Sequence, residues 1–277
     1  MGLPLFLPGA DPGPSFAALV RQTDPAASAM AGPGSEAVRR AGGASGAGGL
    51  AVPHGTTVAA LRYAHGVVMA GDRRATEGNL IAHRGIEKVF PADRHSAVAI
   101  AGAAGPAIEM VKLFQTQLEH YEKVEGVALS LEGKANQLGQ MVREHLPMAM
   151  QGLAVVPLFA GYDLRRGTGR IFTYDVTGGH YEEADHGATG SGGRDARTTI
   201  KLGWRVDLTR DEGIELAVRA LYEAADEDSA TGGPDLIRGI FPLVATVTAE
   251  GYEQVDDAEV AERFTTLLSR RQEGDGP

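Results

Sequence analysis

Few kinds of side chain in this 277-residue sequence could perform covalent chemistry. It contains no cysteine, which excludes disulfides, thiolate metal sites and cysteine nucleophiles. A nucleophile would have to be a serine, a threonine, a lysine or a carboxylate. The glycine-rich run 189–193 lacks the first glycine of a nucleophile elbow, and no phosphate-binding, dinucleotide-binding or paired-histidine motif occurs. By elimination the leading candidate is Thr56, where a tract of small residues gives way to a hydrophobic run.

Thr56 would become reactive if the chain were cut between Gly55 and Thr56. Within a chain, a threonine has a hydroxyl but no base beside it, whereas a cut on its N-terminal side adds an α-amino group. The ordinary pKa of that amine is roughly 7.7 to 8.0, close enough to neutrality to accept the hydroxyl proton. One residue would then be nucleophile and base together. The alternative is that Thr56 and Thr57 only open a β-strand, because threonine favours strands.

The strands nearest Thr56 are predicted to form an interior sheet. Runs 56–63 and 66–71 are β-rich, and residues 64–65 between them are typical of a hairpin turn. Since both faces of these strands are apolar, we expect layers on both sides of the sheet. Further strands are predicted at 80–82, 88–90, 96–101, 153–162, 169–176, near 181, 241–248 and 252–255.

The helices are predicted from apolar stripes. Pro106 suits the first turn of a helix, and apolar residues then recur at steps of four and three as far as Tyr121. Similar stripes occupy 131–142, 212–225 and 260–267. Segregated helices and strands, with sheets covered on both faces, predict an α+β fold: a four-layer αββα sandwich of two antiparallel sheets between helix layers.

Composition divides the chain into two segments. Residues 1–55 hold seven of the 14 prolines and 11 of the 38 glycines but no lysine, so they cannot bury enough apolar surface to offset their ordering entropy. We expect a flexible segment, either a dispensable tail or a removable pro-segment. Residues 56–277 are expected to form one domain that ends in a short polar tail at about 272–277.

Charge and hydropathy exclude several classes of partner. A formal net charge of -10 without basic clusters argues against a nucleic-acid partner. No apolar run is long enough to span a bilayer, and the proline-interrupted start without basic residues is a poor signal peptide. We therefore expect a cytoplasmic protein without a membrane partner, and the sequence indicates neither a metal nor a cofactor.

Motifs spread over residues 53–270 resemble those of the proteasome β subunits, which are N-terminal nucleophile (Ntn) hydrolases. The resemblance depends on 55–58 (GTTV), 68–76 (VMAGDRRAT), 88–89 (KV), 100–102 (IAG), 118–123 (LEHYEK) and 226–236 (DEDSATGGPDL). The last two runs are similar to the actinobacterial type in particular. The resemblance implies the Ntn-hydrolase fold, autocatalytic removal of residues 1–55, and a threonine endopeptidase that works by acyl transfer.

The resemblance also implies a role for each matching residue. Thr56 would be the nucleophile, and the positive charge of Lys88 beside it would favour the alkoxide-like form and lower the amine pKa. Asp72 would hold Lys88 charged and oriented. Gly102 would offer its backbone N–H to the oxyanion. The residues that would order the Thr56 amine and a nearby water are Ser191, Asp226 and Ser229.

Without the resemblance, each of these positions has a structural interpretation. Lys88 would be a solvated strand end, and Asp72 a turn residue after a strand. Gly102 would simply end a strand. Asp226 would be one more charge at an acidic helix terminus, and Ser191 part of a turn.

The same resemblance implies a way of binding substrate. Thr76 and Ala104 match backbone positions that pair with an extended peptide as an added strand, which gives affinity with little demand on sequence. Ala75, Ile100 and Ala104 would line the pocket for the side chain that precedes the cut. Small and aliphatic walls predict a preference for hydrophobic side chains.

Assembly is implied in the same way. The chain would form a homo-heptameric β ring stacked with proteasome α subunits, and a regulatory ATPase ring would deliver unfolded proteins tagged by a small protein modifier. Two alternatives stay open: the shorter two-component ATP-dependent bacterial threonine peptidase, and a non-catalytic structural ring subunit. A mature length of 222 residues (277 minus 55) and the segment 226–235 favour the proteasome type over the shorter peptidase.

Overall fold

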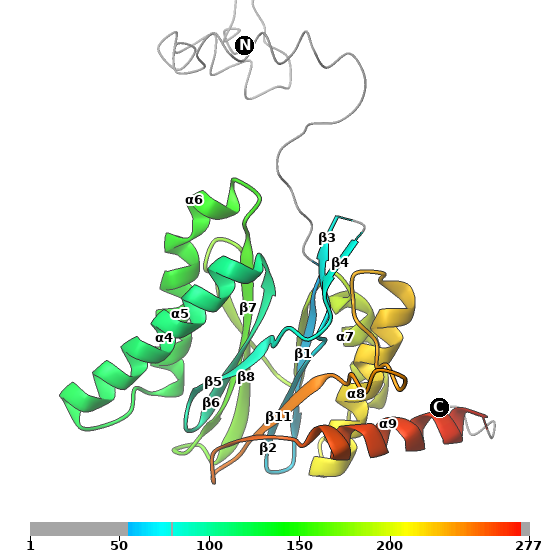
Figure 1. The fold of residues 1–277 in the computed structure, drawn as a ribbon. Helices are drawn as coiled ribbons and strands as arrows, with labels where there is room; N and C mark the ends of the chain where they lie inside the picture. Colours follow the sequence, from blue (N-terminus) through cyan, green and yellow to red (C-terminus); the bar gives the residue numbers. More distant parts are fainter. Residues whose placement is uncertain (1–54, 79, 273–277) are drawn as a thin grey trace, which may run out of the picture. The chain divides into compact units, whose positions relative to one another are not determined.

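The computed structural model describes residues 55–78 and 80–272, which form two stacked five-stranded sheets between helices (Figure 1). The first sheet has the strand order β10-β1-β2-β11-β12. Its pairs are antiparallel. Its strands are β1 (Thr57–Tyr63), β2 (Gly66–Gly71), β10 (His186–Gly190), β11 (Leu243–Val247) and β12 (Tyr252–Gln254).

The second sheet is a meander in chain order, and its pairs are also antiparallel. Its strands are β5 (Val89–Asp93), β6 (Ser96–Gly102), β7 (Val155–Asp163), β8 (Thr168–Tyr174) and β9 (His180–Glu183). A separate small hairpin of β3 (Ala75–Glu77) and β4 (Leu80–His83) lies in the connection between the two sheets.

Helices cover the outer face of each sheet (Figure 1). Those on the second sheet are α4 (Ala104–Glu125) and α5 (Leu131–Glu144), followed by the short α6 (Leu146–Ala149). Those on the first sheet are α7 (Gly193–Gly203), α8 (Arg210–Glu227) and α9 (Asp257–Gln272). The layers therefore run helix, sheet, sheet, helix, which confirms the predicted α+β sandwich.

An apolar layer between the two sheets explains why β1 and β2 are hydrophobic on both faces. Val58 and Met69 of the first sheet are fully buried there against Leu158 and Ile171 of the second. The opposite faces of β1 and β2 pack on the helices of the first sheet through residues such as Leu61. The strand that follows the candidate nucleophile and its neighbour β2 are thus held from both sides.

Four of the described elements were not predicted from the sequence: the three-residue strand β3 and the four-residue helix α6, where a polar loop and a helix end were expected, and also β10 and α7. β10 is a short, half-buried strand of small and polar residues that pairs with β1. α7 starts in the glycine-rich turn and buries only Gly193, Ala196 and Ile200, so it has no continuous apolar stripe. The predicted flexible segment 1–55, except Gly55, and most of the predicted tail lie outside the described residues. None of the described helices has the length and apolar character needed to cross a bilayer.

Candidate active site

Thr56 lies immediately before β1, at the end of the first sheet where the chain enters the fold. It is buried, with 5% of its surface exposed. Its carbonyl accepts a hydrogen bond from Ser191 N (2.8 Å), and its nitrogen donates to Ser191 Oγ (3.3 Å). These two contacts fix the backbone of Thr56 against the glycine-rich turn between β10 and α7.

The space around residue 55 explains why a glycine precedes Thr56. A Cβ built on Gly55 would lie 1.8 Å from the Cβ of Ala230, so no side chain fits there without moving the loop after α8. Its nitrogen donates a buried hydrogen bond to Thr76 Oγ1 (3.0 Å). The peptide bond between Gly55 and Thr56 is thus held between two parts of the fold.

Lys88 and Asp72 form a buried ion pair close to this bond. Lys88 Nζ donates to Asp72 Oδ1 (2.6 Å) and to the carbonyl of Arg74 (2.6 Å). Asp72 is fully buried and accepts three backbone N–H bonds as well, from Thr57 (2.8 Å), Arg74 (2.9 Å) and Gly232 (2.9 Å). The three backbone donors hold the carboxylate of Asp72 in place, and the carboxylate in turn holds the ammonium of Lys88.

Burial changes the proton affinity of Lys88. Loss of water around the ammonium lowers its pKa, and this outweighs the opposite effect of the charge and hydrogen bond of Asp72. Lys88 therefore gives up its proton more easily than an ordinary lysine. A lysine in this condition can accept a proton from a neighbouring hydroxyl.

A narrow cavity brings Thr56 and Lys88 together with predicted substrate-binding residues. It encloses about 350 Å³ of empty space, open mouth included. Of the predicted pocket residues, Ala75, Ile100 and Ala104 all line it, while Thr76 is placed by its bond to Gly55. Its complete lining is Gly55, Thr56, Ala75, Ile86, Glu87, Lys88, Ile100, Gly102, Ala104, Ala107 and Ile108.

The cavity walls include residues that the sequence analysis did not single out for this role. Ile86, Ala107 and Ile108 add aliphatic surface, and Glu87 is a charged member of the lining. Ala107 was visible in the sequence as the start of the apolar stripe of α4, but such a stripe indicates core packing and not a pocket. Ile86 lies in a loop, for which the sequence carries no comparable signal.

Gly102 has a backbone conformation that suits a glycine. Its φ is +111°, and a Cβ there would lie 2.1 Å from the carbonyl oxygen of Ala154. The residue ends β6 and lines the same cavity as Thr56. A side chain at this position would therefore disturb both the strand end and the cavity.

The acidic partner of Ser191 is Asp228, which corrects the prediction of Asp226. Ser191 Oγ donates to Asp228 Oδ2 (2.5 Å), and Thr231 Oγ1 donates to the same oxygen (2.6 Å). Asp226 is exposed on the last turn of α8. The predicted Ser229 is also exposed, and its contact with this region is through its carbonyl, which accepts from Arg74 Nη1 (2.8 Å).

The correction has a clear cause in the chain. α8 ends at Glu227, and Asp228 has an extended backbone, with φ -114° and ψ 108°. The chain changes direction there, and the side chains of Asp228 and Thr231 contact the glycine-rich turn and β1. In the sequence, 226 and 229 have the same spacing as 228 and 231, so the spacing could not distinguish the two pairs.

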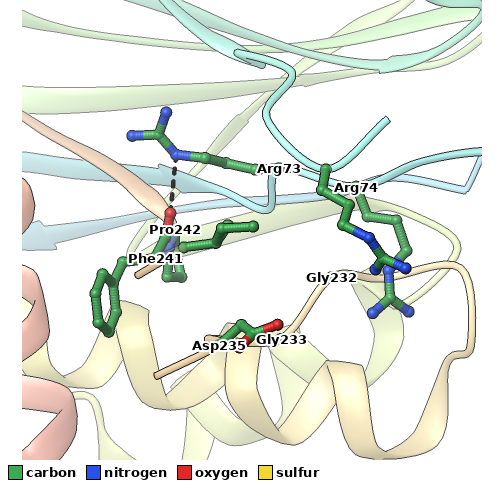
Figure 2. A pocket seen from close by; sticks show the side chains of 9 residues that line it. Arg73, Arg74, Gly232, Gly233, Asp235, Phe241 and Pro242 are labelled. Carbon is green, nitrogen blue, oxygen red and sulfur yellow. Dashed lines mark hydrogen bonds between the residues drawn. The ribbon is translucent and has the colours of Figure 1, made fainter. Parts of the chain in front are cut away.

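A second hollow lies beside the loop that carries Asp72 (Figure 2). Arg73 Nε donates to the carbonyl of Phe241 (2.8 Å), and its Nη2 forms an ion pair with Asp257 at the start of α9 (2.9 Å). Arg74 holds the loop after α8 through Ser229. The full lining is Arg73, Arg74, Arg84, Gly232, Gly233, Asp235, Ile240, Phe241 and Pro242. Arg74 thus ties its own loop to the loop after α8, and both loops donate a backbone N–H to Asp72.

The described residues contain no cluster of three or more histidine, aspartate or glutamate side chains that could hold a metal ion. The arrangement around Thr56 is instead a hydroxyl, a buried lysine of lowered pKa and a hydrogen-bonded carboxylate network. Such a set supports nucleophilic attack on a carbonyl group, with proton transfer between protein groups.

Comparisons with known proteins agree with one another. A family model described as "Proteasome subunit" matches residues 52–237. A protein named "Proteasome subunit beta" from Acidimicrobium ferrooxidans is 64% identical over 262 residues, which cover 95% of this chain and 92% of that protein. Another protein of the same name, from Streptomyces griseus subsp. griseus, is 59% identical over 231 residues, covering 83% of this chain and 82% of that protein.

Proposed function

This chain belongs to the proteasome subunit family, as a β subunit of the bacterial type, and on that premise we propose that it is a self-processing threonine endopeptidase. One observation carries the proposal: Thr56, preceded by a sterically required glycine, lines one cavity together with Lys88, which is held by the buried Asp72.

In the uncleaved chain the nitrogen of Thr56 is an amide, so it cannot act as the base. The hydroxyl proton would pass to the neutral form of Lys88 while Oγ1 of Thr56 attacks the carbonyl carbon of Gly55. The bond between Gly55 and Thr56 nitrogen then breaks, and the proton returns to that nitrogen. Water hydrolyses the resulting ester, which releases residues 1–55 with a carboxylate at Gly55 and leaves Thr56 with a free amine and its hydroxyl.

In the processed chain, the new amine would accept the hydroxyl proton when Thr56 attacks a substrate carbonyl. Ser191 and Asp228 would orient this amine, as the contact between Thr56 N and Ser191 Oγ supports. The positive form of Lys88 nearby would lower the amine pKa. An ester of the substrate on Thr56 forms as the leaving amine departs with a proton, and water resolves that ester.

The N–H of Gly102 would bind the oxyanion that forms in each attack. One donor of this kind contributes roughly 3 to 4 kcal/mol elsewhere. The position of Gly102 in the cavity lining supports this role, and its positive φ is a conformation that most other residues avoid.

Substrates would bind as extended peptides along the backbone of Thr76 and Ala104. The side chain that precedes the cut would enter the cavity, where Ile86, Ile100 and Ile108 provide aliphatic walls. We therefore expect cleavage after hydrophobic side chains. Peptides that differ only at that residue test this, and a preference for acidic or basic side chains would contradict it.

Assembly completes the proposal. The subunit would form heptameric β rings stacked with α subunits, and an ATPase ring would feed unfolded, tagged proteins into the chamber. Exposed apolar side chains on the helices of the second sheet are compatible with subunit contacts: Leu113 is 52% exposed and Met148 38%, and both line a groove between α4 and the α5–α6 region.

Intact-mass measurement of the purified, assembled protein tests the activity. The wild-type chain should lose residues 1–55 and gain the mass of a covalent threonine-directed electrophile on Thr56. Thr56→Ala should retain residues 1–55, whereas Thr56→Ser, which keeps a hydroxyl, should process. If the wild-type chain stays full length and takes up no electrophile, the protein is a structural ring subunit instead.

A further inference from the structure

Thr57, the neighbour of the proposed nucleophile, makes contacts that the chemistry above does not use. It is the first residue of β1 and has no exposed surface. Its hydroxyl accepts a hydrogen bond from Gly192 N (2.9 Å) and lies 2.6 Å from the hydroxyl of Thr231. Its backbone nitrogen donates to Asp72 (2.8 Å). Thr57 therefore touches both polar groups of the site, the Asp72 side and the Asp228 side.

The direction of the hydrogen bonds follows from the charge on Asp228. Burial alone would raise the pKa of this carboxyl, but the hydrogen bonds from Ser191, Thr231 and the backbone of Ala230 hold the pKa below its usual value. An ionised carboxylate only accepts, so the single proton of the Thr231 hydroxyl points to Asp228. The hydroxyl of Thr57 must then donate to that of Thr231.

A second chain of hydrogen bonds reaches the same carboxylate oxygen from Thr56. Ser191 Oγ gives its single proton to Asp228 Oδ2 and accepts from Thr56 N. Thr56, which precedes β1, and Thr57, which begins it, therefore connect to one oxygen of Asp228, the first through Ser191 and the second through Thr231. Such connected networks gain from mutual polarisation and hold their members in place.

Gly192 shows that the fold makes room for this contact. A Cβ on Gly192 would lie 2.7 Å from the hydroxyl oxygens of both Thr57 and Thr231. The φ of Gly192 is -88°, which any residue adopts, so its glycine is explained by space and not by backbone strain. The two hydroxyls occupy the volume that a side chain at 192 would need.

We propose that Thr57 is a positioning residue whose hydroxyl fixes Ser191 and Asp228 relative to Thr56. Gly192 is bonded to Ser191, and Thr57 to Thr56, so the hydrogen bond between Gly192 and Thr57 sets how closely Ser191 Oγ approaches the nitrogen of Thr56. The backbone bond from Thr57 to Asp72 keeps the lysine side in the same frame. The inference rests on the proposed function, because it concerns the amine that this function requires.

The proposal is tested by replacing the hydroxyl of Thr57 with a methyl group, which keeps the shape of the side chain. In the assembled and processed protein, expressed from the complete sequence, Thr57→Val should lower kcat by about 10- to 100-fold, the effect of a small misplacement of a reacting group. KM should change less than about threefold, since Thr57 lies outside the cavity lining and the peptide-binding positions. Thr57→Ser should recover most of kcat. Rates are divided by the number of Thr56 sites that an irreversible electrophile labels, so that misfolded chains do not count.

Gly192→Ala provides a second variant if Thr57→Val fails to assemble. It keeps every hydroxyl but displaces the pair, and it should lower kcat per labelled site in the same range. In a Ser191→Ala background, Thr57→Val should have little further effect, because Thr57 acts by placing the hydroxyl of Ser191.

Wild-type kcat per labelled site in Thr57→Val would overturn the proposal, and so would a Thr57→Ser variant as slow as Thr57→Val. Failure of the proposed function gives a different result, since the wild-type chain itself would then neither process nor take up the electrophile.

Discussion

Within residues 55–78 and 80–272, two lysine–aspartate pairs are buried, and only one of these two borders the candidate active site. Lys88 and Asp72 have side chains 4% and 0% exposed, while Lys134 of α5 and Asp93 of β5 are 6% and 18% exposed. Asp72 takes its other bonds from three backbone N–H groups in separate segments. Asp93 takes its other bonds from the adjacent turn, from His95 N (3.0 Å) and Ser96 Oγ (2.6 Å).

The difference shows that burial of an ion pair does not by itself indicate a functional site. Both pairs incur a desolvation cost that a well-packed apolar pair would avoid. The Lys134 pair ties α5 to the second sheet. The Lys88 pair joins the two loops and the strand that meet at Thr56, and its lysine lines a cavity with that residue. What distinguishes the two pairs is the cavity that Lys88 shares with Thr56, and not the burial of the pair itself.

The largest expected effect is a difference in peptide hydrolysis between variants of Lys88 and of Lys134. Lys88→Met should leave residues 1–55 attached, because the proton acceptor of self-cleavage is lost, and it should lower peptide hydrolysis by about 10²- to 10⁴-fold, because Thr56 then has no free amine. Lys134→Met should change kcat less than about threefold, although each variant leaves a buried carboxylate unpaired and should lose about 3 to 5 kcal/mol of stability. Kinetics, intact mass and urea unfolding measure this. A folded Lys134→Met chain without activity would remove the distinction.

The second-largest expected effect is a difference between Asp72 and Asp93 when each is replaced by asparagine. In Asp72→Asn the amide NH₂ faces two donors in either orientation, so we expect about a 100-fold loss of kcat and roughly 3 kcal/mol of stability. Asp93→Asn can relax toward solvent and should lose about 1 to 3 kcal/mol with kcat unchanged. Equal stability losses in urea unfolding would argue against the importance of the backbone donors to Asp72.

The pH dependence of stability should depend on Lys88. Burial lowers the pKa of Lys88 in the folded chain, so between that pKa and the ordinary value of 10.5 the unfolded chain binds more protons. Stability from this group therefore rises with pH in that window, by at most about 1.4 kcal/mol per pH unit. Relative to Lys88→Met, the wild-type chain should gain stability as the pH increases toward about 10, and Lys134→Met, which keeps Lys88, should retain this rise. A flat or falling difference in urea unfolding would contradict the lowered pKa.

The smallest expected effect concerns the hydroxyl donors. Ser96→Ala removes one bond to Asp93 and should lose about 1 kcal/mol with kcat unchanged. Ser191→Ala removes a similar bond to Asp228 and should lose a similar amount of stability, but it should also slow hydrolysis. If both substitutions affect only the melting temperature, Ser191 has no part in the chemistry.

The two pairs were not equally visible in the sequence. Lys88 and Asp72 belong to motifs of the proteasome β subunits, so their pairing was predicted. The structure places Lys88 Nζ 2.6 Å from Asp72 Oδ1. Lys134 lies within a helical stripe, where a lysine normally indicates a solvated face. Its contact with Asp93 joins residues 41 positions apart (134 minus 93), and nothing local in either segment marks it.

The sequence by itself determined the layered α+β fold, because strands apolar on both faces require cover on both sides and the helical stripes supply it. It also determined that Thr56 is the candidate nucleophile, since a chain without cysteine offers few others. The tertiary structure decided that Asp228 and Thr231, and not Asp226 and Ser229, join the site, because α8 ends one residue before Asp228. It decided too that Thr57 connects the two halves of the site. Hydrogen bonds between residues 135 and 174 positions apart depend on how the turns and sheets pack, and residue spacing along the chain does not encode them.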